Sequence, residues 1–60
     1  MNIEVTFNNG KIVEFPCVKV GTIKVDSNKN WSFKYGKNGS TAIIIMNNVN
    51  YMEIIEKNID

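Results

Sequence analysis

The side chains with the clearest chemical potential in this sequence are lysines, which gather in its middle third. Residues 19–37 contain five lysines and one acidic residue, so this stretch carries a net charge of +4, whereas the rest of the chain carries −3. Lysine ammonium groups attract phosphates as point charges, without the bidentate geometry of arginine. We therefore expect an anion-binding site here, the alternative being a solvated lysine edge that opposes aggregation. The expected ligand-binding residues are Lys24, Lys34, Tyr35 and Lys37.

The residue types that are missing exclude most catalytic chemistry. The chain has no histidine, no arginine and a single cysteine, which excludes histidine-based acid–base catalysis, Ser-His-Asp and Cys-His pairs, histidine metal sites and multi-cysteine zinc sites. The carboxylates lack a neighbouring catalytic group, so we expect no catalytic residue, no metal and no cofactor, and hence a protein that is not an enzyme. Cys17 follows Pro16 in an apolar pattern and is predicted to be a small buried hydrophobe.

The composition indicates that β-strands position these residues. Isoleucine, valine, threonine and the aromatic residues supply 24 of the 60 residues, and these types favour strands. Residues 2–8 and 11–17 each alternate apolar and polar side chains, as half-buried strands do. A three-residue turn between them pairs Val5 with Val13 and keeps one face apolar, with Gly10 in the left-handed conformation.

Residues 31–35 alternate three aromatic side chains with polar ones. We expect this aromatic stripe to face the core, the alternative being a platform on which nucleic-acid bases stack. In the segment before it, Val25 is predicted to pair with Trp31, and Gly21 is predicted to mark a bend.

Residues 41–46 are apolar on both sides of the strand that they predict. A five-residue turn over residues 36–40 places Ile43 opposite Phe33 and Ile45 opposite Trp31. This register leaves a second apolar face that so small a chain has no third layer to cover. An uncovered apolar patch marks an interaction surface, so we expect a homo-oligomer. The alternatives are a foreign protein partner and burial under the C-terminal segment. The expected interface residues are Ala42, Ile44, Met46, Met52 and Ile54.

The C-terminal segment is predicted to hold a final strand over residues 51–56. Apolar residues at helical spacing leave a short helix over residues 48–58 as the alternative, and residues 57–60 are expected to fray. We therefore predict a single all-β domain over residues 1–60, an antiparallel barrel or rolled sheet of five or six strands.

The order of these elements resembles that of small Sm-like or SH3-like barrels. Residues 43–55, with a brief turn at Asn47-Asn48, resemble the close of such domains. Residues 3–11 resemble the opening hairpin of many short proteins from phages and low-GC Gram-positive bacteria. The resemblance implies a barrel that assembles into oligomers. The turn at Asn47-Asn48 departs from RNA-binding Sm-like proteins, because it lacks the basic residue that they carry there.

Together with this resemblance, these features predict a non-enzymatic, homo-oligomeric binding protein of phage or low-GC bacterial type that holds a small anionic ligand or a host protein at a subunit interface. A cyclic nucleotide signal of host defence is one such ligand, and very small oligomeric phage proteins that sequester these signals are similar in size. The first alternative is a small nucleic-acid-binding barrel that uses the lysine-rich stretch, and the second is a protein adaptor or inhibitor. The sequence shows neither a leader nor an apolar run long enough to span a membrane, so a cytoplasmic location is expected.

Overall fold

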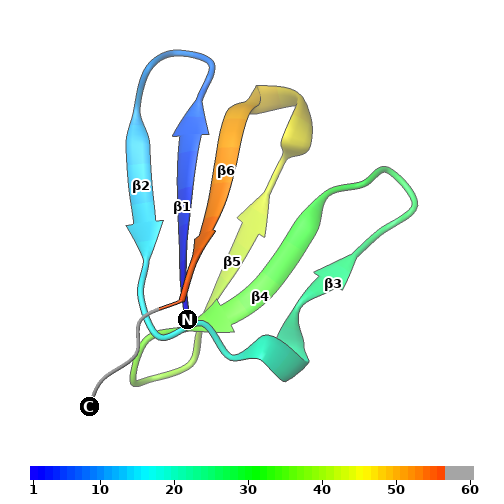
Figure 1. Ribbon diagram of the computed structural model, residues 1–60. Helices are drawn as coiled ribbons and strands as arrows, with labels where there is room; N and C mark the ends of the chain where they lie inside the picture. The colour runs from blue at the N-terminus through cyan, green and yellow to red at the C-terminus, as the bar shows by residue number, and fades with distance from the viewer. Residues whose placement is uncertain (57–60) are drawn as a thin grey trace.

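The computed structural model, which describes residues 1–56, consists of two three-stranded antiparallel sheets (Figure 1). The first sheet has the order β2-β1-β6, with the bounds β1 Asn2–Phe7, β2 Ile12–Phe15 and β6 Val49–Ile55. The second has the order β3-β4-β5, with the bounds β3 Lys24–Val25, β4 Trp31–Tyr35 and β5 Ser40–Ile44. Two short 3-10 turns connect strands, η1 Val20–Thr22 and η2 Met46–Asn48. The predicted all-β class is confirmed.

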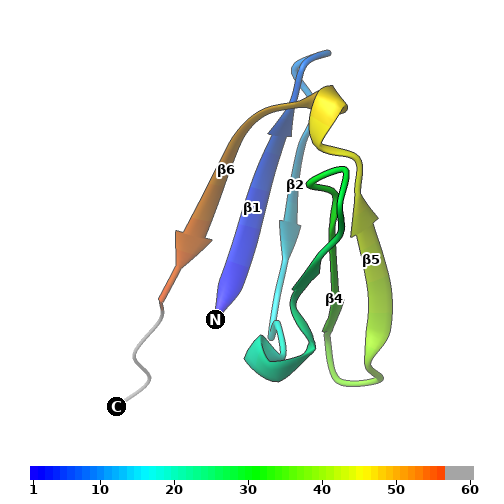
Figure 2. The same cartoon turned by 90° about the vertical axis from the view of Figure 1, so that its right-hand side faces the viewer.

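The two sheets form separate layers that enclose the core (Figure 2). Each sheet contributes the apolar side of its alternating strands, and Phe33 from β4 meets Phe15 from β2 edge to face, with ring centroids 5.4 Å apart. The buried core side chains are Ile3, Val5, Val18, Phe33, Ala42 and Ile44, of which Ile3, Val5 and Phe33 are fully buried. Across the described residues the sheets keep separate hydrogen-bond ladders and do not close into a barrel.

The predicted register of the first hairpin is confirmed. Val5 pairs with Val13, and Gly10 has φ 88°, the left-handed conformation that glycine adopts at little cost. The Phe7 amide donates to the Lys11 carbonyl oxygen at 2.8 Å, which closes the three-residue turn. This register puts the apolar side chains of β1 and β2 on the same face, and both strands bury that face.

The chain then crosses from the first sheet to the second. Cys17 has φ 51°, and its amide donates to Asn2 Oδ1 at 3.2 Å. The amides of Val18 and Lys19 donate to the carbonyl oxygens of Met1 and Lys34, so this short segment bonds to both sheets. The kink leaves Cys17 exposed, and the prediction of a buried cysteine is wrong because alternation does not continue through a left-handed residue.

After the crossing, the chain turns at η1, which contains Gly21, and enters β3. The expected bend at Gly21 therefore takes the form of a 3-10 turn. The predicted pairing of Val25 with Trp31 is confirmed. Trp31, Phe33 and Tyr35 all pack against the core, so the expected structural role of the aromatic stripe is confirmed as well.

The register of β4 with β5 differs from the prediction by one residue. The turn between them spans four residues instead of five, so Phe33 pairs with Ala42 and Trp31 pairs with Ile44. Gly36 and Gly39, both with positive φ, shape this shorter turn. A shift of one residue reverses the faces of a strand.

The reversal changes which residues of β5 face outward. Ile44 is 2% exposed and Ala42 is also buried, whereas Ile43 is 68% exposed. The expectation that Ala42 and Ile44 lie on an uncovered outer face is therefore wrong, because both belong to the chain's own core.

The final strand is confirmed and the helical alternative is wrong over the described residues. β6 runs antiparallel to β1, with Met52 opposite Val5 and Ile54 opposite Ile3. The turn before it is η2, in which the Asn48 amide donates to the Ile45 carbonyl oxygen at 2.9 Å. The expected frayed end at residues 57–60 lies outside the described residues.

Candidate anion-binding site

The outer face of the second sheet presents polar side chains in two cross-strand rows. Because Phe33 points into the core, its neighbours Ser32 and Lys34 point away from it. The ladder pairs Ser32 with Lys24 of β3 on one side and with Ile43 of β5 on the other, and it pairs Lys34 with Thr41. Two lysines from different strands therefore share one face.

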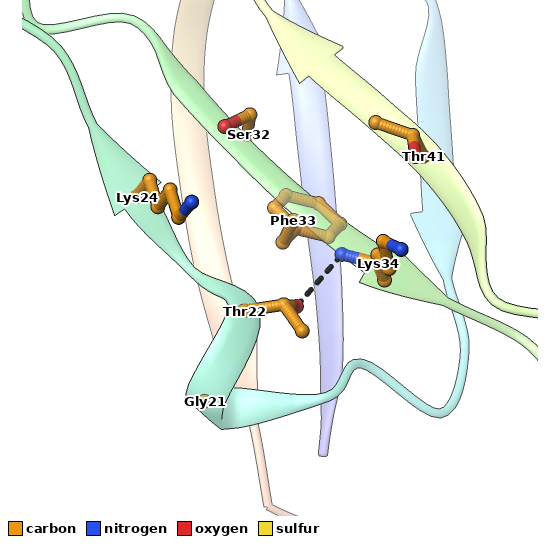
Figure 3. Close-up of a pocket in the computed structure, with 7 residues that line it drawn as sticks. All are labelled: Gly21, Thr22, Lys24, Ser32, Phe33, Lys34 and Thr41. Atoms are coloured by element: carbon orange, nitrogen blue, oxygen red, sulfur yellow. Dashed lines mark hydrogen bonds between the residues drawn. The ribbon is translucent and has the colours of Figure 1, made fainter.

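A shallow depression of about 340 Å³ lies between these lysines (Figure 3). Three of its lining residues carry hydroxyl groups, two carry ammonium groups and none is acidic. Phe33 is the buried member, and its ring packs against Phe15 and Tyr35 on the core side of the sheet. The lining residues are Gly21, Thr22, Lys24, Ser32, Phe33, Lys34 and Thr41.

Thr22 fixes one wall of the depression by two hydrogen bonds. Its hydroxyl donates to the Lys19 carbonyl oxygen at 2.6 Å and accepts a hydrogen bond from the Lys34 amide at 2.8 Å, the latter drawn in Figure 3. The Lys19 amide donates in turn to the Lys34 carbonyl oxygen at 2.9 Å. These bonds hold η1 against β4, so the backbone that carries Lys34 is positioned before any ligand arrives.

A second depression of about 410 Å³ adjoins the first and shares Lys24 and Ser32 with it. It extends the site towards the exposed side chain of Ile43. Its one acidic lining residue, Asp26, uses Oδ1 to accept hydrogen bonds from the amides of Asn28 and Asn30, at 2.8 and 2.9 Å. This carboxylate therefore shapes the β3–β4 turn.

The surroundings of the two lysines leave their charge available. Among residues 1–56, neither Lys24 nor Lys34 forms an ion pair, and the hydroxyl groups of Ser32 and Thr41 form no hydrogen bond within the protein. Ammonium groups and hydroxyl donors arranged around an open depression suit a phosphate or a similar anion. The aliphatic side chain of Ile43 adds an apolar contact beside them.

The structure brings together two of the four predicted ligand-binding residues. Lys24 and Lys34 line the depression, whereas Lys37 lies in the β4–β5 turn outside it. The Tyr35 ring packs on Phe15, with centroids 5.0 Å apart, so this residue serves the core. Sequence reasoning missed Thr22, Ser32 and Thr41. The alternation that buries Phe33 already placed Ser32 beside Lys34, but the wall formed by Thr22 depends on the 3-10 turn.

The predicted interface residues do not form one surface. Ala42 and Ile44 are buried in the core, and Met46 and Met52 pack against it. Ile54, on β6, is 49% exposed.

Comparison with known proteins adds no relative. No protein-family model, curated protein or solved structure matches the chain significantly. None of the helical segments in residues 1–56 has the length and apolar character that crossing a bilayer requires. The same residues contain no group of three or more histidine, cysteine, aspartate or glutamate side chains placed to hold a metal ion.

Proposed function

We propose that this protein is a non-enzymatic binding protein that self-associates and holds a small phosphate-bearing anion at the depression between Lys24 and Lys34. The observation that carries the proposal is the convergence of two lysines, from separate strands, with the hydroxyl groups of Ser32 and Thr41 on a depression whose lining holds no acid. The charge pattern of the sequence had indicated the two lysines, and Lys24 and Lys34 lie on the same face of the second sheet.

The size and chemistry of the site suit a nucleotide. The two adjoining depressions, about 340 and 410 Å³, fall within the range of small-molecule sites. Phosphate groups match the lysines, and Ile43 offers an apolar contact for a base or sugar. Cyclic nucleotide signals of host defence combine these two parts and belong to this ligand class.

The strength of binding follows from the exposure of the charges. At a separation of about 4 Å each lysine–phosphate contact contributes about 1–4 kcal/mol, depending on how much water screens it. Two such contacts, with hydrogen bonds from two hydroxyl groups, correspond to a dissociation constant between roughly millimolar and micromolar.

The small core supports self-association. Only six hydrophobic residues are buried among the described residues, and natural domains of this size often gain stability from a partner chain. The surface also carries exposed apolar side chains on both sheets, including Ile12, Ile43 and Tyr51.

The test is calorimetric titration with inorganic phosphate and a panel of mono- and cyclic nucleotides. We expect saturation at a fixed stoichiometry, and at least tenfold weaker binding for Lys24→Gln and for Lys34→Gln, because a tenfold change corresponds to about 1.4 kcal/mol. The matched control is Lys11→Gln, in the β1–β2 turn, which leaves affinity within twofold.

Equal affinity in all three variants, or no binding by any member of the panel at 10 mM, would overturn the proposal. So would tight binding of a short single-stranded oligonucleotide that falls steeply with salt while mononucleotides do not bind. That result would favour the nucleic-acid alternative, in which counterion release dominates.

A further inference from the structure

The outer face of the first sheet carries a row of three glutamates. Glu4, on the central strand β1, pairs with Glu14 of β2 on one side and with Glu53 of β6 on the other. Directly opposite residues of antiparallel strands have their Cβ atoms about 4.5–5.5 Å apart. The three glutamates therefore occupy one cross-strand row that includes all three strands of the sheet.

No lysine shares the ladder positions of this sheet within the described residues. The Asn2 side-chain amide donates to Glu14 Oε2 at 2.6 Å, which satisfies one carboxylate oxygen of the row. Glu4 and Glu53 lie directly opposite each other, and a pair of like charges in this position destabilises a sheet. A cationic surface laid over the row would offset this repulsion.

The chain itself presents such a surface on its other side. Because the core lies between the two sheets, their outer faces point in opposite directions (Figure 2). One outer face carries Glu4, Glu14 and Glu53, and the opposite one carries Lys24 and Lys34. Each copy therefore presents a negative layer and a positive layer.

We propose that the acidic face of one copy docks on the cationic face of a second copy. The acidic row has apolar neighbours in the next row of the same sheet, where Thr6 lies between Ile12 and Tyr51. The cationic face has Ile43. All three apolar side chains are exposed in the single chain, so the contact buries apolar surface between the charged groups.

A stable interface buries about 800 Å² on each partner. The single chain has 4470 Å² of accessible surface, so each face would give up about a fifth of it. The two surfaces that meet are different, so the contact is heterologous and repeats from copy to copy, as a ring or as an open stack.

The docked copy and an anionic ligand use the same lysines. This part of the inference rests on the proposed function, since the carboxylate row occupies the groups that would hold a phosphate. Ligand binding and docking therefore exclude each other at Lys24 and Lys34. A phosphate-bearing ligand that binds only free subunits shifts the equilibrium towards them by RT ln(1 + L/Kd), where L is the free ligand concentration.

The experiment uses two charge-reversed variants, with sedimentation velocity at low ionic strength as the readout. The first, Glu4→Lys with Glu53→Lys, makes both faces positive, and the second, Lys24→Glu with Lys34→Glu, makes both negative. We expect wild type to form concentration-dependent assemblies and each variant alone to associate at least tenfold more weakly. An equimolar mixture of the two variants should assemble again, because a positive face then meets a negative one.

Circular dichroism is the check that each variant is folded. Lys11→Glu is the control variant, for which we expect assembly to be unchanged. Assembly of the mixed variants would also show that both are folded, because an unfolded variant would not associate. A wild-type monomer at about 1 mM, a mixture that stays monomeric, or assemblies that survive in both variants would each overturn the inference.

The two proposals fail in different ways. The Glu4→Lys/Glu53→Lys variant keeps Lys24 and Lys34, so calorimetry on it measures ligand binding without competition from docking. If it binds nucleotide while wild type stays monomeric, the proposed function stands and docking is overturned. If the reversed variants reassociate in the mixture but no nucleotide or phosphate binds, docking stands and the ligand proposal is overturned.

Discussion

The two outer faces of this molecule are built alike and charged differently. Each is the solvent side of a three-stranded antiparallel sheet, but the first sets Glu4 directly between Glu14 and Glu53. On the second, Lys24 lies opposite Ser32 and Lys34 lies opposite Thr41, so each lysine has a hydroxyl neighbour instead of a like charge.

This difference in the arrangement of charges indicates which kind of partner each face suits. The second face surrounds its separated charges with hydrogen-bond donors and with hollows, which suits a small ligand. The first face concentrates its charge in a single cross-strand row. A hollow of about 270 Å³ lies at the end of this sheet and is lined by Phe7, Asn8, Asn9 and Asn48. A row of glutamates suits a broad cationic surface.

The largest effect on stability is expected in β5, whose two sides face the core and the cationic face. Ile44→Ala should lower the free energy of unfolding by about 2–5 kcal/mol, because it leaves a cavity in a closely packed core. Ile43→Ala, one residue away but exposed, should change it by no more than about 0.5 kcal/mol. Urea denaturation measures both values. The reverse order would mean that the faces of β5 are the other way round.

A smaller effect is expected at the wall of the cationic face. Thr22→Val removes the oxygen that accepts the Lys34 amide and should cost about 1 kcal/mol of stability. It should also weaken nucleotide binding, because η1 is no longer held against β4. Thr41→Val on the same face is the matched change, since its hydroxyl forms no hydrogen bond within residues 1–56. Equal losses of stability in the two variants would show that Thr22 does not fix the wall.

The smallest effect, and one of opposite sign, is expected in the glutamate row. Glu4→Gln removes the central charge and should raise the free energy of unfolding of the monomer by about 0.2–1 kcal/mol. The gain should shrink as salt screens the repulsion. Glu56→Gln, an exposed acid just after β6, should leave stability unchanged. Denaturation of dilute protein at two salt concentrations measures the free energy of unfolding of both variants. A loss of stability in Glu4→Gln would mean that other interactions of the protein already offset the repulsion within the row.

Much of the fold could be predicted where one side of a strand is polar. In β1 and β2 the alternation and Gly10 together allow a single register, and the structure has it. In β5 both sides are apolar, so alternation cannot choose between Ile43 and Ile44. The length of the turn before it decides, and tertiary packing sets that length.

The charge pattern of the sequence predicted the lysines of the candidate site but not its other residues. Lys24 and Lys34 stood out because acids are scarce around them, and the fold places both on one face. Tyr35 did not join them, because an aromatic residue in a small protein is needed for the core. No sequence pattern identified Thr22, because its role depends on the 3-10 turn η1, which brings its hydroxyl to the Lys34 amide of β4.

The exposed Cys17 at the crossing between the sheets gives the protein a single attachment point for a fluorescent dye. With one dye on every copy, a head-to-tail stack would set the fluorophores at a constant repeat along its length. Energy transfer between like dyes would then depolarise the emission progressively as subunits are added. A two-fold pair would depolarise it only once, so the anisotropy of one labelled sample distinguishes an open series from a closed pair.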